Sequence, residues 1–120
     1  MAGNIVHFEF PGDDGARATS FWSSLFAWEF QEYGDSGYLM TSTPSQAGAV
    51  SVRQEGEMGV VVYFDTDDVV ATGEKVASLG GSVLMPKVPV PGMGYFAICR
   101  DTEGNTFGLW ESDESAAAPS

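Results

Sequence analysis

One pattern of residues occurs twice in this sequence, and it decides the fold. The first copy, residues 6–30, reads VHFEFPGDDGARATSFWSSLFAWEF, and the second, residues 60–84, reads VVVYFDTDDVVATGEKVASLGGSVL. Each copy has an alternating apolar run, a pair of aspartates, a segment with helical periodicity and the start of another strand. Aligned in this way, Asp13-Asp14 falls on Asp67-Asp68. The chain is therefore predicted to contain one structural unit twice.

A second alignment extends the repeat through the rest of each half. Residues 37–39 (Gly-Tyr-Leu) fall on 94–96 (Gly-Tyr-Phe), and residues 50–52 (Val-Ser-Val) fall on 107–109 (Phe-Gly-Leu). Each half then reads as a strand, a helix and three strands, which predicts an α+β protein. The expected elements are strands at about 4–10, 28–33, 37–42, 48–53, 59–65, 82–88, 94–100 and 106–111, and helices at about 14–26 and 68–79.

These elements predict one domain over residues 1–112, with modules at about 4–54 and 58–112, followed by a flexible acidic and alanine-rich tail over 113–120. One aspartate of each pair is expected to cap a helix, and Gly80-Gly81 is expected to end the second helix. The proline-rich segment Pro86–Met93 is predicted to be a loop, either a stiff connection or a lid over a ligand.

Composition excludes several classes of function. The 120 residues carry a formal net charge of −12, so binding to nucleic acid is excluded, because that affinity comes largely from Lys and Arg. Neither a membrane-spanning segment nor a signal peptide is visible, and a cytoplasmic location is expected. The single cysteine, Cys99, is predicted to be a small strand residue.

Strand alternation divides the side chains between two faces. The apolar face is expected to pack against the helices. It consists of Val6, Phe8, Phe10, Val50, Val52, Val60, Val62, Phe64, Phe107 and Leu109. The opposite face has mixed polarity and suits either a wetted sheet or a ligand-binding wall. It consists of Ile5, His7, Glu9, Ala49, Ser51, Arg53, Val61, Tyr63, Asp65, Thr106, Gly108 and Trp110.

Several motifs together resemble the vicinal oxygen chelate superfamily, which includes glyoxalase I, extradiol dioxygenases and bleomycin resistance proteins. Residues 21–28, FWSSLFAW, look like the family's FYxxLFGW, and residues 101–111, DTEGNTFGLWE, are close to its DPxGNxFxLxE ending. Residues 5–9, 79–81 and 91–96 add to the likeness. The resemblance implies paired βαβββ modules whose sheets curl around a cleft, helices on the outside, and frequent homodimers.

The resemblance also implies four positions for metal ligands, which fall here on His7, Ser51, Val61 and Gly108. Only His7 offers a good ligand, whereas a catalytic site generally needs about three from the protein. No cofactor is therefore expected. An irregular divalent-metal site that combines His7 with Glu9 or Asp65 is the alternative. Glu111 is expected to be a solvated carboxylate at the end of a strand.

The sequence thus predicts a metal-independent protein that binds a small molecule, as the bleomycin-resistance branch sequesters a drug. The alternative is a glyoxalase-like lyase, isomerase or dioxygenase, or a metal-free enzyme with His7 or Glu9 as base. A third is an accessory protein with a vestigial cleft. The predicted ligand contacts are His7, Glu9, Ser51, Arg53, Val61, Tyr63, Asp65, Gly108 and Trp110. Side chains near strand ends or loops, for which core packing competes with a role in the ligand wall, are Trp28, Tyr38, Met40, Met58, Met93 and Tyr95.

Overall fold

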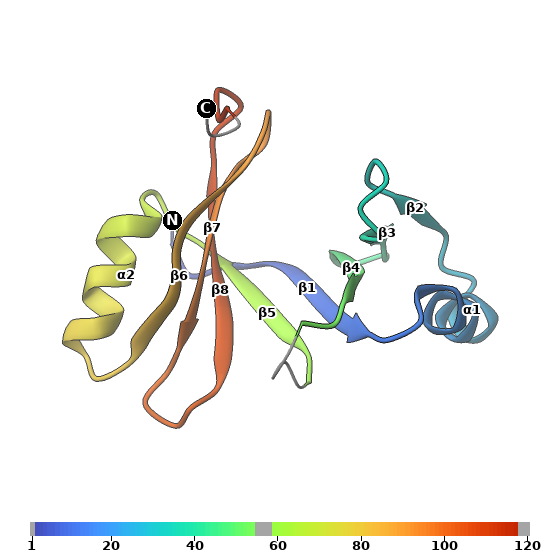
Figure 1. Ribbon diagram of the computed structural model, residues 1–120, viewed down its shortest axis with the longest axis horizontal. Coiled ribbons are helices and arrows are strands. Elements are labelled where there is room, and N and C mark those ends of the chain that lie inside the picture. The colour runs from blue at the N-terminus through green and yellow to red at the C-terminus, as the bar shows by residue number, and fades with distance from the viewer. Residues whose placement is uncertain (1, 55–58, 118–120) are drawn as a thin grey trace. The chain divides into compact units, whose positions relative to one another are not determined.

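The computed structural model describes residues 2–54 and 59–117, and each half has the predicted order of elements (Figure 1). The α+β class with two βαβββ modules is confirmed. The first half comprises β1 (Ile5–Gly12), α1 (Gly15–Phe26), β2 (Phe30–Glu32), β3 (Leu39–Ser42) and β4 (Ala47–Val52). The second comprises β5 (Val61–Asp65), α2 (Val69–Ser78), β6 (Ser82–Val90), β7 (Gly94–Arg100) and β8 (Thr106–Ser112).

The chain divides into two compact units. Residues 7–61 form the first unit, and residues from 62 onward form the second together with the N-terminal residues up to 6. The N-terminal residues join the second unit through Asn4, whose carbonyl accepts a hydrogen bond from the Asp65 amide at 2.9 Å. The predicted module boundary near residue 58 and the last part of the predicted tail lie outside the described residues.

The first unit has strands in the order β2-β3-β4-β1, with β1 parallel to β4 and the other pairs antiparallel. Phe10 lies opposite Val50 in the register, and its ring stacks on Trp22 of α1 at 4.8 Å between centroids. The predicted helix-facing row of β1 is therefore confirmed here. Because successive side chains alternate, His7 and Glu9 lie on the other face of this sheet.

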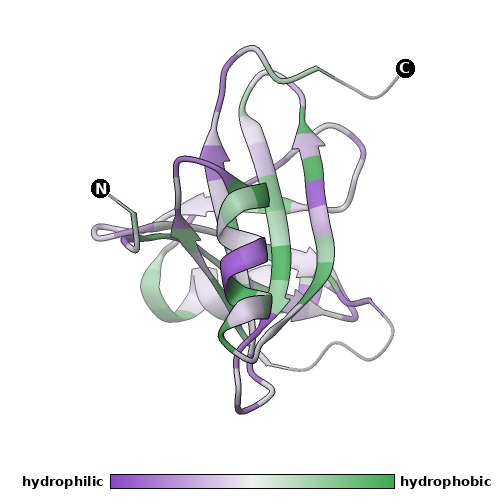
Figure 2. Cartoon of the chain, turned by 90° about the vertical axis from the view of Figure 1, so that its left-hand side faces the viewer, coloured by the Kyte–Doolittle hydropathy of each residue, from purple (hydrophilic) through white to green (hydrophobic). Residues whose placement is uncertain are grey.

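The second unit has strands in the order β5-β8-β7-β6, with β5 parallel to β8. Helix α2 lies across one face of these strands (Figure 2). The core between them consists of Val69, Ala97, Cys99 and Leu109, none of them more than 4% exposed. Burial raises the pKa of the Cys99 thiol, in keeping with its predicted place in a strand.

The second aspartate of each pair is the helix cap. Asp14 accepts from the Arg17 amide at 3.0 Å, and Asp68 accepts from the amides of Val70 and Ala71. The prediction for Glu111 is wrong, because its Oε1 accepts from the Val69 amide at 3.0 Å and so adds a second acceptor at the start of α2. Among the described residues neither helix, at 12 and 10 residues, could span a bilayer.

One predicted loop and the predicted C-terminal tail are more ordered than expected. The prediction of a loop at Pro86–Met93 is largely wrong, because β6 pairs with β7 as far as Val90, which lies opposite Gly94. Proline is tolerated there because β6 is an edge strand, and two register shifts accommodate it. The tail predicted from residue 113 contacts the β6–β7 turn, where the Gly92 amide donates to the carbonyl of Ala116, a residue only 5% exposed.

Candidate functional site

Three polar side chains meet on the face of the first unit that is turned away from α1. The Tyr38 hydroxyl donates to Glu9 Oε2 at 2.6 Å and lies 2.5 Å from His7 Nε2. His7 Nε2 and Glu9 Oε2 are 3.6 Å apart, and the side chains of His7 and Glu9 are 26% and 14% exposed. We call these three residues the His7–Tyr38–Glu9 cluster.

The backbone explains how these residues come together. His7 and Glu9 are two positions apart on β1, so their side chains point to the same side of the strand. Tyr38 immediately precedes β3 and is held by the turn before it. Its carbonyl accepts from the Tyr33 amide at 2.9 Å, and its own amide donates to Ser36 Oγ at 3.1 Å. Gly37 has a φ of 79°, which the turn requires and which glycine adopts without strain.

The direction of the hydrogen bonds sets what the cluster can do. Tyr38 gives its single proton to the Glu9 carboxylate, so its oxygen accepts from His7, which must carry a hydrogen on Nε2. The result is a chain of donors that ends on a carboxylate. Such a chain can orient a ligand oxygen, and it provides a route along which a proton can move between imidazole and carboxylate.

Ser51 of β4 belongs to the same face. It lies opposite Pro11 in the register, two residues after the partner of Glu9. The residue is 9% exposed, and its Oγ has no hydrogen-bond partner among the described residues. An unpaired buried hydroxyl costs stability, so its presence fits a role in receiving a ligand.

The corresponding face of the second unit is aromatic. Tyr63 is 6% exposed and lies opposite Gly108, where a Cβ would overlap its ring. Phe96, which sequence reasoning missed, meets Tyr63 edge-on at 6.4 Å between centroids. It lies opposite Trp110, whose indole N–H donates to Ser112 Oγ at 2.9 Å. The two predicted aromatic residues therefore share an apolar surface with Phe96.

Two predicted ligand contacts have other partners. The Asp65 carboxylate accepts from the Asn4 amide at 2.8 Å and so holds the N-terminal segment. Arg53 donates from Nε to Asp13 Oδ1 and from Nη2 to the Pro11 carbonyl, both at 3.0 Å. It lines a groove beside α1 together with Phe21, so the structure places it away from the His7–Tyr38–Glu9 cluster.

The residues suggested as ligand walls also differ in their surroundings. Tyr95 packs against the core of the second unit and has Lys87 Nζ 4.2 Å from its ring centroid. Trp28 belongs to the aromatic cluster beside α1, and Met58 lies outside the described residues. Tyr38 of this set contacts both His7 and Glu9. No spacing in the sequence marks it, since it lies 29 residues from Glu9.

Comparison with known proteins shows the family of the chain. Residues 4–109 match the model of the Glyoxalase/Bleomycin resistance protein/Dioxygenase superfamily. The chain belongs to this superfamily. Its sequence is 30% identical over 120 residues to a glyoxylase-like domain-containing protein of Didymella fabae, with 91% of this chain and 94% of that protein covered.

Two further relatives of this superfamily member are longer proteins. The anthracycline biosynthesis protein DnrV of Streptomyces peucetius is 28% identical, with 86% of this chain and 45% of that protein covered. The putative glyoxylase CFP32 of Mycobacterium bovis is 29% identical, with 88% of this chain and 44% of that protein covered. The chain thus spans a little under half the length of these two relatives.

Solved structures support the superfamily fold. A superfamily member from Vibrio splendidus 12B01 has a TM-score of 0.70 at 13% identity and covers 94% of this chain and 100% of its own. A methylmalonyl-CoA epimerase of Streptomyces coelicolor has a TM-score of 0.62 at 17% identity, with 98% and 99% covered. At these identities the likeness shows the fold alone.

The residues of this chain do not fit the metal site that the superfamily implies. Val61 is 3% exposed and has no donor atom, and the space beside Gly108 is occupied by the Tyr63 ring. Nε2 of His7, the remaining good ligand, is hydrogen-bonded to Tyr38. Within the part of the chain that the structure describes, no three His, Cys, Asp or Glu side chains are grouped to hold a metal ion.

Proposed function

We propose that this chain is a metal-independent binding protein that receives a small oxygen-bearing molecule at the His7–Tyr38–Glu9 cluster. The observation that carries the proposal is the hydrogen-bonded chain from His7 through Tyr38 to Glu9, on a sheet face that α1 does not cover. The Ser51 hydroxyl, unpaired among the described residues, supplies a further polar contact on that face. Binding as a homodimer in the cytoplasm stays a prediction.

The ligand class follows from the groups available. Glu9 accepts a hydroxyl hydrogen, and His7 or Tyr38 donates to a carbonyl or phenolate oxygen after a small rearrangement. The Tyr38 ring, which stacks beside the His7 ring at 6.2 Å between centroids, offers flat apolar surface in the same unit. The name of the Streptomyces peucetius relative, an anthracycline biosynthesis protein, adds support for a polycyclic aromatic ligand. We therefore propose a hydroxylated polycyclic quinone as the ligand class.

Calorimetric titration with 1,4-dihydroxyanthraquinone, a neutral representative of this class, tests the proposal. His7→Ala and Glu9→Gln are each expected to weaken binding about tenfold, which corresponds to about 1.4 kcal/mol. Glu114→Gln is the charge-matched control, because Glu114 is an exposed carboxylate near the C-terminus. Equal affinity of all four proteins would contradict the site. Elemental analysis of the purified protein is the second arm of the test. Metal retained near one equivalent by the unaltered chain and lost by His7→Ala would contradict metal independence.

The second candidate is a metal-free enzyme in which the same cluster acts as acid and base. It is favoured by the bridging position of Tyr38, through which a proton can pass between His7 and Glu9. Incubating a panel of α-hydroxy ketones with the protein in deuterated water tests it. Deuterium incorporation that Glu9→Gln abolishes would support catalysis, whereas incorporation at the background rate would leave binding as the function.

A further inference from the structure

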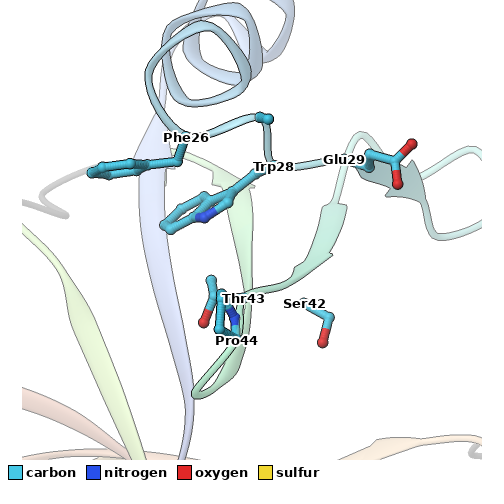
Figure 3. Close-up of a pocket in the computed structure, with 7 residues that line it drawn as sticks. Phe26, Trp28, Glu29, Ser42, Thr43 and Pro44 are labelled. Atoms are coloured by element: carbon cyan, nitrogen blue, oxygen red, sulfur yellow. The ribbon is translucent and has the colours of Figure 1, made fainter.

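A hollow lies in the first unit at the C-terminal end of α1, apart from the groove that Arg53 and Phe21 line. It has a volume of about 440 Å³ and lies between the end of the helix and the β3–β4 turn (Figure 3). Phe26, Trp28 and Glu29 border it on the helix side, and Thr43 and Pro44 border it on the other. We propose that this hollow binds a small organic cation, an alkyl- or arylammonium ion, in addition to the ligand of the His7–Tyr38–Glu9 cluster.

The aromatic wall of the hollow is rigid. The Trp28 ring stacks on Trp22 at 5.2 Å between centroids and 13° between planes, and Phe26 lies 5.5 Å from Trp28. Figure 3 shows the indole on the side of the hollow opposite Thr43 and Pro44. Tryptophan is the side chain that attracts a cation most strongly through the face of its ring, and a ring already held in place loses little entropy when a ligand binds.

The backbone is shaped to present these rings. Ala27, between Phe26 and Trp28, has a φ of 59°, a left-handed conformation that costs a non-glycine residue roughly 1 kcal/mol. Two hydrogen bonds hold it there, from the Ala27 amide to the Ser23 carbonyl at 2.8 Å and from Ser23 Oγ to the Trp28 carbonyl at 2.6 Å. Both rings consequently lie on the same side of the chain (Figure 3).

The charge on the lining favours a cation over an anion. Among the described residues that line the hollow, Glu29 is the charged one, and neither Lys nor Arg is present. The backbone of Glu29 is held by Thr41, whose hydroxyl donates to the Glu29 carbonyl at 2.8 Å. The Glu29 side chain is exposed. The formal net charge of −12 also raises the local concentration of cations around the protein.

The hollow is separate from the proposed quinone site. Trp28 contacts Phe8 at 6.2 Å between centroids, and Phe8 is on the face of β1 that packs against α1. His7 and Glu9, on either side of Phe8 in the sequence, point to the opposite face. Occupation of one site is therefore measurable without the other.

Titration with choline and with its neutral isostere 3,3-dimethylbutan-1-ol tests the inference, because the two differ in charge and scarcely in shape. Choline is expected to bind about tenfold more tightly and to shift the indole N–H resonance of Trp28 more than that of Trp110. Glu29→Gln is expected to weaken choline binding severalfold, and Trp28→Leu by about tenfold. Phe26→Leu, at a position 57% exposed, is a second aromatic deletion that spares the fold.

Matched controls complete the design. Phe21→Leu removes an aromatic side chain that is 60% exposed on the same helix but outside this hollow, and Glu114→Gln removes an exposed carboxylate that does not line it. Both are expected to bind choline like the unaltered chain. Equal affinity for the neutral isostere, or choline binding that neither Glu29→Gln nor Phe26→Leu weakens, would overturn the proposal.

Discussion

Replacing Tyr38 with phenylalanine removes one oxygen atom and tests whether the three residues act as a unit. The hydroxyl makes a 2.6 Å hydrogen bond to the Glu9 carboxylate and a 2.5 Å contact with His7 Nε2. A hydrogen bond to a charged group contributes about 1.5–3 kcal/mol, and a neutral one about 0.5–1.5 kcal/mol. Because the cluster is partly exposed, each hydrogen bond is expected to contribute near the lower end of its range. Tyr38→Phe is therefore expected to lower the free energy of unfolding by about 2 kcal/mol.

Urea denaturation of four proteins measures this loss and the coupling behind it. The set is the unaltered chain, Tyr38→Phe, Glu9→Gln and the double variant. Because the two side chains share a hydrogen bond, the double variant is expected to lose at least about 1 kcal/mol less than the sum of the single losses. For a domain of this size, 2 kcal/mol also corresponds to a fall of about 8 °C in the midpoint of thermal unfolding.

Tyr33→Phe is the matched control, because Tyr33 is 43% exposed in the same turn. It is expected to change stability by less than about 0.5 kcal/mol. A loss for Tyr38→Phe as small as that of the control, or additive effects of Tyr38→Phe and Glu9→Gln, would refute the reasoning that the cluster is a coupled unit.

Three further predictions concern single side chains. Ala27→Gly is expected to raise the free energy of unfolding by about 0.5–1 kcal/mol in calorimetry, since glycine adopts the left-handed conformation without strain. Ser51→Ala is expected to raise stability by up to about 1 kcal/mol while it weakens quinone binding, and a loss of stability in denaturant would contradict the unpaired hydroxyl. Hydrogen bonds from Asn105 lower the pKa of Asp101 below its ordinary 3.8, so its contribution to stability is present above this ordinary value and is lost as pH falls through the lower pKa of the folded chain. The stability difference between the unaltered chain and Asp101→Asn should therefore shrink on acidification, and a constant difference in urea midpoint would argue against this.

Most of the fold could be predicted because it depends on local patterns. Alternation located the strands, and the two Asp-Asp pairs located the helix starts, where Asp14 and Asp68 are the caps. The error at Pro86–Met93 has a clear physical cause. Proline weakens a strand prediction because it removes a donor, yet an edge strand does not need that donor on its open side.

The candidate site was predicted only in part. The two-residue spacing of His7 and Glu9 along β1 correctly predicted that they share one face, since side chains alternate along any strand. The contact of Tyr38 with both depends on how β3 is brought alongside β4 and β1, which no local pattern encodes. Arg53 shows the opposite failure. It follows the end of β4, where alternation no longer constrains the side chain, and it turns to Asp13 instead.

By itself, the sequence determined the repeated module, the faces of its strands and the family, because these properties depend on periodicity and on short motifs. Only the tertiary structure decided which polar groups meet. It joined His7, Tyr38 and Glu9, left the Ser51 hydroxyl unpaired among the described residues, and filled the space beside Gly108 with the Tyr63 ring. The physical reason is that hydrogen bonds and close packing act over a few ångströms in space, between residues whose separation along the chain carries no signal.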